Sequence, residues 1–409
     1  MAQSAESQYV APRPRFPALD PEPPRRSRRG AVLALIVTLA VSGGVIYATL
    51  TPGTPPRQAA APAVSRTSDL TGIVLAENTS GELSLTDVRT GKEHLLKGAG
   101  EFGPGLAVSP DDKLLFDPGS SKVLSLAEEL NPVSVLNQLT FAPNTTASYP
   151  WSDHNSYVLQ LPPALSYGYT GNGDATLQSV HTGAKIDLGV GDTAAGDPQQ
   201  AGAFFSVPTS GTPPATSNRQ GPDSELVLAD AGAPTHVLAT SAALIQTLGF
   251  AAGTAVTLQP MVNPQGTMVA VEVAADNKSQ SPSGIVVLSR SGQMLGAAQM
   301  TGGGSTVMSW STAGTSLALV GGSASGTYLV QWKIGAKALT RIPFPKKYYA
   351  QQCIWAPDDT AVLCSAYHFI ARGRPLVTPT ESWIAFASGR AHVLGEHGQV
   401  LAWLSGHLE

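Results

Sequence analysis

Charged residues are scarce in this sequence. Only 13% of the 409 residues are Asp, Glu, Lys or Arg, and the formal net charge is −4. Because a nucleic-acid-binding protein needs a basic surface to neutralise phosphates, this composition argues against nucleic acid as a partner. Aromatic residues reach only 6%, so a hydrophobic core must consist mainly of Val, Leu, Ala and Ile.

The sequence also lacks the motifs of catalytic and metal chemistry. Its eight histidines are scattered and show no metal-ligand spacing. It contains no G-x-S-x-G elbow, no phosphate-binding loop and no dinucleotide-binding glycine motif. We therefore expect no catalytic residue, no cofactor and no metal, and a binding function is favoured over an enzymatic one.

Only two cysteines are present, Cys353 and Cys364. They stand at equal distances from the Asp358–Asp359 turn in the stretch CIWAPDDTAVLCSA (353–366). In a two-residue hairpin they would face each other, with Cβ atoms ~4.5–5.5 Å apart. This symmetry predicts a disulfide, which an extracytoplasmic location would permit. Two buried free thiols, or a redox-active pair, are the alternatives.

One long uncharged run lies near the N-terminus, AVLALIVTLAVSGGVIYATL (31–50). As a helix it would span ~30 Å, the thickness of a bilayer core. The basic stretch RRSRRG directly precedes it, so the positive-inside rule places residues 1–30 in the cytoplasm and 51–409 outside. The sequence predicts a single-pass plasma-membrane protein, and a secreted protein with a cleaved signal peptide is the alternative.

The segments around this run differ from the rest of the chain. Residues 1–30 are predicted to be a disordered cytoplasmic tail, and 51–69 a Pro/Ala-rich linker. Residues 70–409 hold most of the 42 glycines and 32 prolines, which indicates many short strands and turns. The abundance of Ala, Gly, Pro and Thr is typical of a bacterium with a GC-rich genome.

A strand–turn–strand pattern recurs through residues 70–409 at intervals of about 45 residues. The copies are LAVSPDDKLLF (106–116), YPWSDHNSYVLQL (149–161), PMVNPQGTMVAVEV (260–273), MSWSTAGTSLALV (308–320) and CIWAPDDTAVLCSA (353–366), with a poorer copy at TAAGDPQQAGAFFSV (193–207) aligned on Gly196. A second hairpin separates successive copies. Each repeat therefore holds four strands, as a β-propeller blade does.

The number of blades follows from the two patterns. The second hairpin occurs seven times and the first six times, because the chain starts at TGIVLAE (71–77), where a second strand belongs. The missing inner strand is supplied by GQVLAWLSG (398–406). The predicted fold is all-β, a propeller of seven four-stranded blades closed by the C-terminal strand and preceded by one transmembrane helix. Six or eight blades, or a two-domain β-sandwich, are the alternatives.

The turns SPDDKLLF (109–116) and APDDTAVL (356–363) resemble the S-P-D-G-K turn of WD40-like and TolB-like propeller repeats. The resemblance covers residues 71–406 and implies the fold, but it implies no particular activity. The Gly-His and Trp-Asp dipeptides of typical WD40 blades are missing.

The longest loops are predicted to share one face of the propeller. They join the second and third strands of a blade, or one blade to the next, and loops on a rigid scaffold often bind partners. The candidate binding residues are Tyr167, Tyr169, Lys346, Lys347, Tyr348, Tyr349, His368, Phe369, Arg372 and Arg374. The expected partner is a protein or a cell-envelope component. The second reading is a lactonase- or hydrolase-type enzyme, which needs acidic or His residues at the central channel.

Overall fold

A computed structural model describes residues 70–78, 82–96, 106–117, 120–126, 134–139, 150–161, 173–191, 193–208, 224–275, 283–300, 308–323, 326–336, 339–346, 348–368 and 381–405. All of them belong to one compact unit, Ile46–Glu409. The predicted tail, transmembrane segment and linker (1–30, 31–50 and 51–69) lie outside this part of the chain. Within it, none of the helical structure has the length and hydrophobicity needed to span a bilayer.

The described strands form seven four-stranded antiparallel sheets, which confirms the predicted propeller. From the inner to the outer strand, blade 1 consists of β28 (Gln399–Leu404), β1 (Ile73–Glu77), β2 (Leu83–Asp87) and β3 (Glu93–Leu95). Blade 2 consists of β4 (Ala107–Val108), β5 (Leu114–Asp117), β6 (Lys122–Ser125) and β7 (Ser134–Gln138). Blade 3 consists of β8 (Trp151–Ser152), β9 (Tyr157–Gln160), β10 (Gly173–Ser179) and β11 (Lys185–Gly191).

The remaining four blades follow in chain order. Blade 4 consists of β12 (Ala194–Gly196), β13 (Gly202–Pro208), β14 (Ser224–Asp230) and β15 (His236–Thr240). Blade 5 consists of β16 (Val256–Val262), β17 (Met268–Ala275), β18 (Ser283–Ser289) and β19 (Met294–Met300). Blade 6 consists of β20 (Met308–Trp310), β21 (Ser316–Ser323), β22 (Gly326–Lys333) and β23 (Thr340–Pro343). Blade 7 consists of β24 (Tyr348–Trp355), β25 (Ala361–His368), β26 (Glu381–Ala387) and β27 (Arg390–His397).

The core lies between the blades, so the central strands are buried on both faces. In β17, Val269 and Val271 pack with Phe204 of blade 4. The residue between them, Ala270, packs with Trp310 of blade 6. Because successive side chains of a strand point to opposite faces, such a strand must be apolar at nearly every position. This arrangement explains the scarcity of charge in the sequence.

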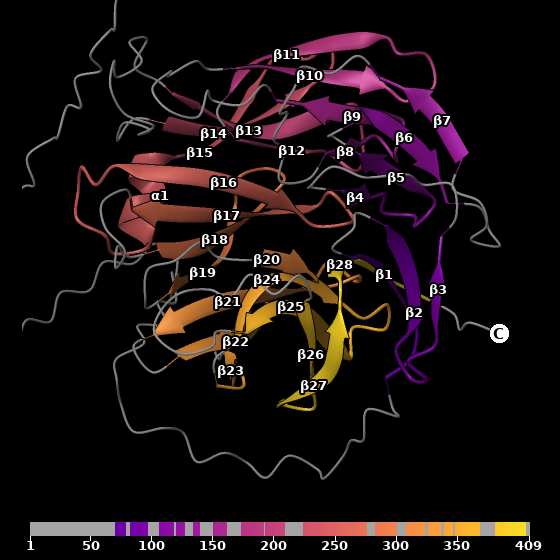
Figure 1. Ribbon diagram of the computed structural model, residues 1–409. Coiled ribbons are helices and arrows are strands. Elements are labelled where there is room, and N and C mark those ends of the chain that lie inside the picture. The colour runs from indigo at the N-terminus through magenta and orange to yellow at the C-terminus, as the bar shows by residue number, and fades with distance from the viewer. Residues whose placement is uncertain are drawn as a thin grey trace, which may run out of the picture. The chain divides into compact units, whose positions relative to one another are not determined.

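The C-terminal strand closes the ring, as predicted. The yellow β28 pairs with the indigo β1 in antiparallel register, from Leu404 opposite Ile73 to Gln399 opposite Glu77 (Figure 1). The indole Nε1 of Trp403 also donates to the backbone oxygen of Thr71 at 3.0 Å. The first and last described segments of the propeller are therefore neighbours.

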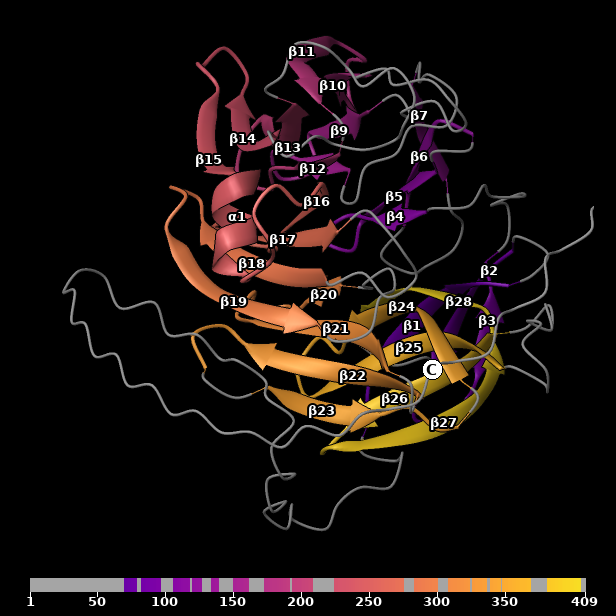
Figure 2. The same cartoon turned by 90° about the vertical axis from the view of Figure 1, so that its left-hand side faces the viewer.

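The described residues contain one helix, α1 (Ser241–Thr247), in the connection between blades 4 and 5, where the sequence analysis expected only strands and loops. The hydroxyl of Thr240 accepts a hydrogen bond from the amide of Ala243 and caps the helix N-terminus. Leu244, Ile245 and Leu248 are buried, and the helix lies against β14 and β15 (Figure 2). The i, i+1, i+4 spacing of these three apolar residues was the available signal.

The strand order gives the propeller two unlike faces. Turns between the first and second strands of a blade, and between the third and fourth, lie on one face, which we call the short-turn face. Connections between the second and third strands, and between blades, lie on the opposite long-loop face. The chain enters β1, a second strand, from the short-turn face, as predicted.

Candidate functional site

Blade 7 carries the described part of the predicted binding surface. Tyr348 begins β24 and His368 ends β25, and these two residues are paired. The connections at 344–347 and 369–380 therefore leave the blade at the same end, on the long-loop face. Lys346 is exposed, and the Tyr349 side chain is 48% exposed. Tyr348 is half-buried and packs against the core between blades 6 and 7.

The other predicted binding residues remain a prediction. Tyr167, Tyr169, Lys347, Phe369, Arg372 and Arg374 lie outside the described residues, as does the side chain of His368. The structure adds one basic residue that the sequence analysis missed. Arg341 lies over the ring of Tyr328, with Cζ 5.1 Å from the ring centroid. Its strand, β23, ends at Pro343 directly before the loop that carries Lys346, so the cation belongs to the same end of the molecule.

The wall of the central channel is formed by the seven innermost strands. Their described residues are apolar, aromatic, amide or hydroxyl residues, and none is charged or a histidine. At one point of this wall the side-chain amide of Gln399 donates to Gln352 at 2.7 Å. In the described part of the chain, no group of three or more His, Cys, Asp or Glu residues could hold a metal ion.

A second polar arrangement lies on the short-turn face, where a turn joins the first two strands in each of blades 2 to 7. Each of these turns opens with a small or polar residue that is nearly inaccessible to solvent: Ser109, Ser152, Asp197, Asn263, Ser311 and Ala356. Where this residue is polar, its side chain can close the turn. The Asn263 Oδ1 accepts the amides of Thr267 and Met268 at 2.9 Å each, and the Ser109 Oγ accepts the amide of Leu114 at 2.8 Å.

The structure corrects the alignment of blade 4 by one residue. Gly196 was expected at the opening position of the turn, but the amide of Asp197 bonds to the oxygen of Gly202. This matches the bond from Asn263 to Met268 in blade 5, so Asp197 holds the position. The poor match of this copy to the pattern made the frame ambiguous.

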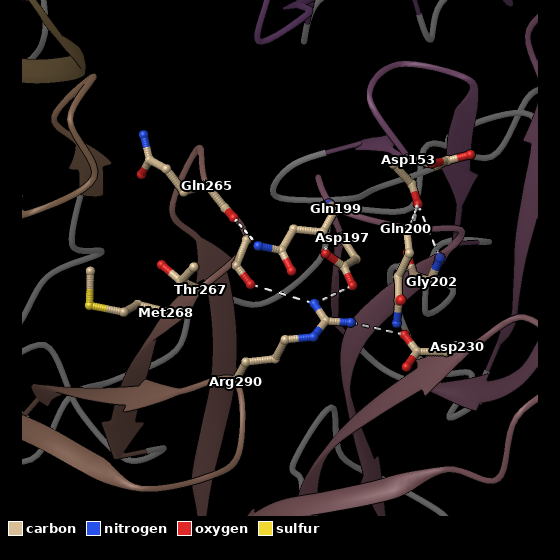
Figure 3. A network of polar contacts seen from close by, with 12 residues as sticks. Asp153, Asp197, Gln199, Gln200, Gly202, Asp230, Gln265, Thr267, Met268 and Arg290 are labelled. Carbon is tan, nitrogen blue, oxygen red and sulfur yellow. Dashed lines mark hydrogen bonds and ion pairs between the residues drawn. The ribbon is translucent and has the colours of Figure 1, made fainter.

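A buried carboxylate at this position requires a cation, which the next blade supplies. Arg290 Nη1 lies 2.5 Å from Asp197 Oδ2, and Nη2 lies 3.3 Å from Asp230 Oδ1 (Figure 3). Asp197 is fully buried and Arg290 is 24% exposed. Burial raises the pKa of Asp197, while the amide of Gln199 and the guanidinium of Arg290 act in the opposite direction. The network therefore fastens blade 4 to blade 5.

Tryptophan side chains join other pairs of neighbouring blades, each through the same type of hydrogen bond. Trp151, Trp310 and Trp355 each precede the opening residue of a turn. Their indole Nε1 atoms donate to Ala107, Met261 and Ser309 of the preceding blade, at 3.2, 3.0 and 3.0 Å. Each acceptor stands two residues before the turn of its own blade. The sequence signal was Trp directly before the turn in YPWSDHN, MSWSTAG and CIWAPDD.

The predicted disulfide is confirmed. Cys353 of β24 faces Cys364 of β25 in the strand pairing, and the two residues form a disulfide. Both are buried in the core between blades 6 and 7. A buried crosslink within a blade points to a structural role, and its presence indicates an oxidising compartment.

Comparison with known proteins finds similarity only at the level of structure. No protein-family model and no curated protein matches the sequence. A putative TolB from Agrobacterium tumefaciens is 13% identical, with 81% of this chain and 91% of that chain covered and a TM-score of 0.40. An oligogalacturonate lyase in complex with manganese is 15% identical, with 69% and 79% covered and a TM-score of 0.48.

A third similar structure is the β-propeller domain of Cps50 (Swd1) from Myceliophteria thermophila. It is 11% identical, with 74% of this chain and 87% of that chain covered and a TM-score of 0.45. At identities of 11–15% and TM-scores below 0.5, the likeness to these three structures says nothing about function. The conclusion that the chain folds as a seven-bladed β-propeller rests on its own sheet order.

Proposed function

We propose that this protein is a membrane-anchored, extracytoplasmic binding or scaffold module. Its partner is a protein or a cell-envelope component that docks on the long-loop face at blade 7. The observation that carries the proposal is the pairing of Tyr348 with His368, because it brings two loops to one end of the blade. Those loops and the strand ends beside them hold most of the basic and aromatic residues predicted to bind.

The composition of these two loops supports an acidic partner surface. The segments 343–351 and 367–380 contain Lys346, Lys347, Arg372 and Arg374 and no Asp or Glu, whereas the whole chain has a net charge of −4. Tyr and Arg are enriched in binding hot spots, where large side chains contribute most of the affinity. A local basic patch on an otherwise acidic protein attracts and orients an oppositely charged partner.

The topology supports presentation of this face away from a membrane. The disulfide favours an oxidising compartment, and the uncharged run 31–50 has the length of a bilayer-spanning helix. The chain enters β1 from the short-turn face. A tether at 51–69 would therefore leave the long-loop face directed outward, ~20–60 Å from the bilayer depending on linker extension.

The test is crosslinking in intact cells followed by co-purification. We expect the wild type to capture a partner, and the combined replacement of Tyr348, Tyr349, Arg372 and Arg374 by Ala to abolish capture. Because Tyr348 is half-buried, a second variant, Lys346→Ala with Tyr349→Ala, restricts the change to exposed positions and should weaken capture. The melting temperature of each variant reports whether the fold is intact.

A matched control changes the opposite face. Replacing the exposed residues Thr360 and Asp358 by Ala alters a short turn of the same blade and should leave capture intact. If capture survives the loop replacements but is lost in this control, the partner binds the short-turn face and the proposal is wrong. Protease added to intact cells should digest 51–409 and spare 1–30, and a soluble body that begins near residue 64 would show a cleaved signal instead.

A further inference from the structure

Polar residues recur at one level of the strands that surround the central channel. In each blade where this level is described, a polar residue of the inner strand is paired with a polar residue of the second strand. The inner-strand residues are Thr193, Gln259, Gln352 and Gln399, and their second-strand partners are Ser206, Glu272, Ser365 and Glu77. We call these eight residues the polar layer. The matching residues of blades 2, 3 and 6 lie outside the described part of the chain.

The members of the polar layer stand at the same distance from the short-turn face. In blade 5, Val262 precedes the turn and pairs with Val269, and Glu272 stands three residues further along the second strand. The same count applies in blades 4, 7 and 1, where it leads from Ala203 to Ser206, from Val362 to Ser365 and from Val74 to Glu77. Because the inner strands run towards the short-turn face, the layer lies on the long-loop side of the channel.

In blade 4 the protein itself satisfies the polar groups of this layer. Ser206 is fully buried, and a buried hydroxyl is stable only with a hydrogen-bond partner. Its Oγ lies 3.1 Å from the hydroxyl of Thr193, which in turn donates to the backbone oxygen of Leu258 in blade 5. The layer here fastens two blades and leaves no group for a ligand.

The seam between blades 7 and 1 is different. The inner strands β24 and β28 lie side by side there (Figure 1), and Gln399 Nε2 donates to Gln352 Oε1 at 2.7 Å. Among the described residues, the amide nitrogen of Gln352 and the amide oxygen of Gln399 have no partner. Ser365, opposite Gln352, is fully buried, and its hydroxyl has no hydrogen-bond partner in the described structure. The layer is therefore incomplete at this seam.

Gln259 provides a third amide, on blade 5. Its strand β16 is an inner strand, yet the side chain is exposed, whereas Leu258 and Pro260 on either side of it are buried. Since the inner strands form the wall of the channel, an exposed side chain at this position faces the channel. No hydrogen bond within the described residues engages this side chain.

The chemistry of the three amides indicates an uncharged ligand with several hydroxyl groups. An amide carries a carbonyl acceptor and two N–H donors, and a hydroxyl both donates and accepts, so the hydroxyls of one sugar ring can bond to both parts of an amide. The described inner strands contain no charged residue that could pair with a charged ligand. The carboxyl groups of Glu272 and Glu77 in the same layer disfavour an anion.

We propose that the polar layer binds an uncharged sugar, which enters the central channel from the long-loop face. Gln352 and Gln399 bond to its hydroxyls from blades 7 and 1, and Gln259 does so from blade 5. The ligand also supplies the partner that the Ser365 hydroxyl lacks. This site lies inside the ring and not on the loops of blade 7, so it does not depend on the protein or cell-envelope partner proposed above.

Saturation-transfer NMR of the full-length protein tests the site with glucose, galactose and N-acetylglucosamine, each titrated over the millimolar range. We expect at least one of these neutral sugars to bind. The acidic sugars glucuronate and galacturonate should not bind detectably. If none of the neutral sugars binds, or if an acidic sugar or the cationic glucosamine binds more tightly than all of them, the proposal is wrong.

Variants then locate the bound sugar. Gln259→Leu removes an amide without a described hydrogen bond, so it should raise the Kd about fivefold, as for loss of one hydrogen bond, at an unchanged melting temperature. The pair Gln352→Leu and Gln399→Leu should raise the Kd further. The control Ser309→Ala changes β20 about 7 Å nearer the short-turn face and should leave the Kd unchanged. A Kd that stays at the wild-type value in the folded glutamine variants would overturn the proposal.

Discussion

The side chain of Arg290 joins two blades through three contacts. It pairs with Asp197 and Asp230, and its guanidinium lies 5.8 Å from the ring centroid of Phe204. The other polar opening residues of these turns are Ser or Asn, which need no counter-ion. Asp197 alone among the six makes its blade depend on a charge from another blade.

Removal of the Arg290 side chain should therefore destabilise the fold. We expect Arg290→Ala to lower the free energy of unfolding by about 3 kcal/mol, because a buried carboxylate loses its partner. Without the Arg290 guanidinium, burial would raise the pKa of Asp197 further above its unfolded value, so stability should be largest at low pH and decline as the pH rises through the folded-state pKa. Urea denaturation at several pH values measures both effects.

A second substitution provides the control for this prediction. Asp197→Asn introduces the residue that opens the turn of blade 5, and in the Arg290→Ala background it should restore most of the lost stability and remove the pH dependence. A double variant as unstable as Arg290→Ala at neutral pH would show that Arg290 acts mainly through packing.

Contacts between residues close together in the sequence could be predicted from the sequence, whereas contacts between residues of different blades could not. The disulfide could be predicted because Cys353 and Cys364 stand at equal distances from one turn. Arg290 could not be assigned to Asp197, because the two residues belong to different blades and no pattern links their positions. The Trp residues before the turns formed a repeat in the sequence, but their hydrogen-bond acceptors depend on how the blades pack.

Individual blades tolerate different lengths of inner strand. The inner strands β4 and β8 have two residues each, whereas β24 has eight. The second hairpin gave the correct blade number because it is continuous in the sequence in all seven blades, whereas the first hairpin of blade 1 is divided between β28 and β1. Blade 4 was misaligned by one residue because its turn, DPQQA, has no residue with positive φ three residues after the opening residue, where the other five described turns have Asp, Asn or Gly.

The disulfide crosslinks the two inner strands of the last blade. Mass spectrometry of the unreduced protein should show one linked peptide pair containing Cys353 and Cys364. Replacing both residues by Ala should lower the free energy of unfolding by about 2–3 kcal/mol on chain-entropy grounds alone. Alkylation of both thiols in the native, unreduced protein would contradict the assignment.

The ring as a whole is closed by a strand from the far end of the described chain. Deletion of 398–409 removes β28 and leaves β1 without its inner neighbour. We expect aggregation or poor expression, because the unpaired backbone of a sheet edge can pair with another chain. Size-exclusion chromatography and thermal melting measure the outcome.

A shorter deletion separates closure by β28 from the contribution of the residues that follow it. Removal of 406–409 keeps every pairing between β28 and β1 and should leave a folded monomer. An unchanged melting temperature after removal of 398–409 would mean that the strand does not close the ring.

Closure at this seam also determines how the molecule bears a mechanical load. A pull on the chain before Leu70, opposed by a partner held on the long-loop face, acts along the axis of β1. The hydrogen bonds of an antiparallel pair lie across the strands, so those joining β1 to β28 and β2 are sheared together rather than broken one at a time. The strand that follows the point of pulling is held on both sides, so the ring can transmit force without opening strand by strand from its first residue.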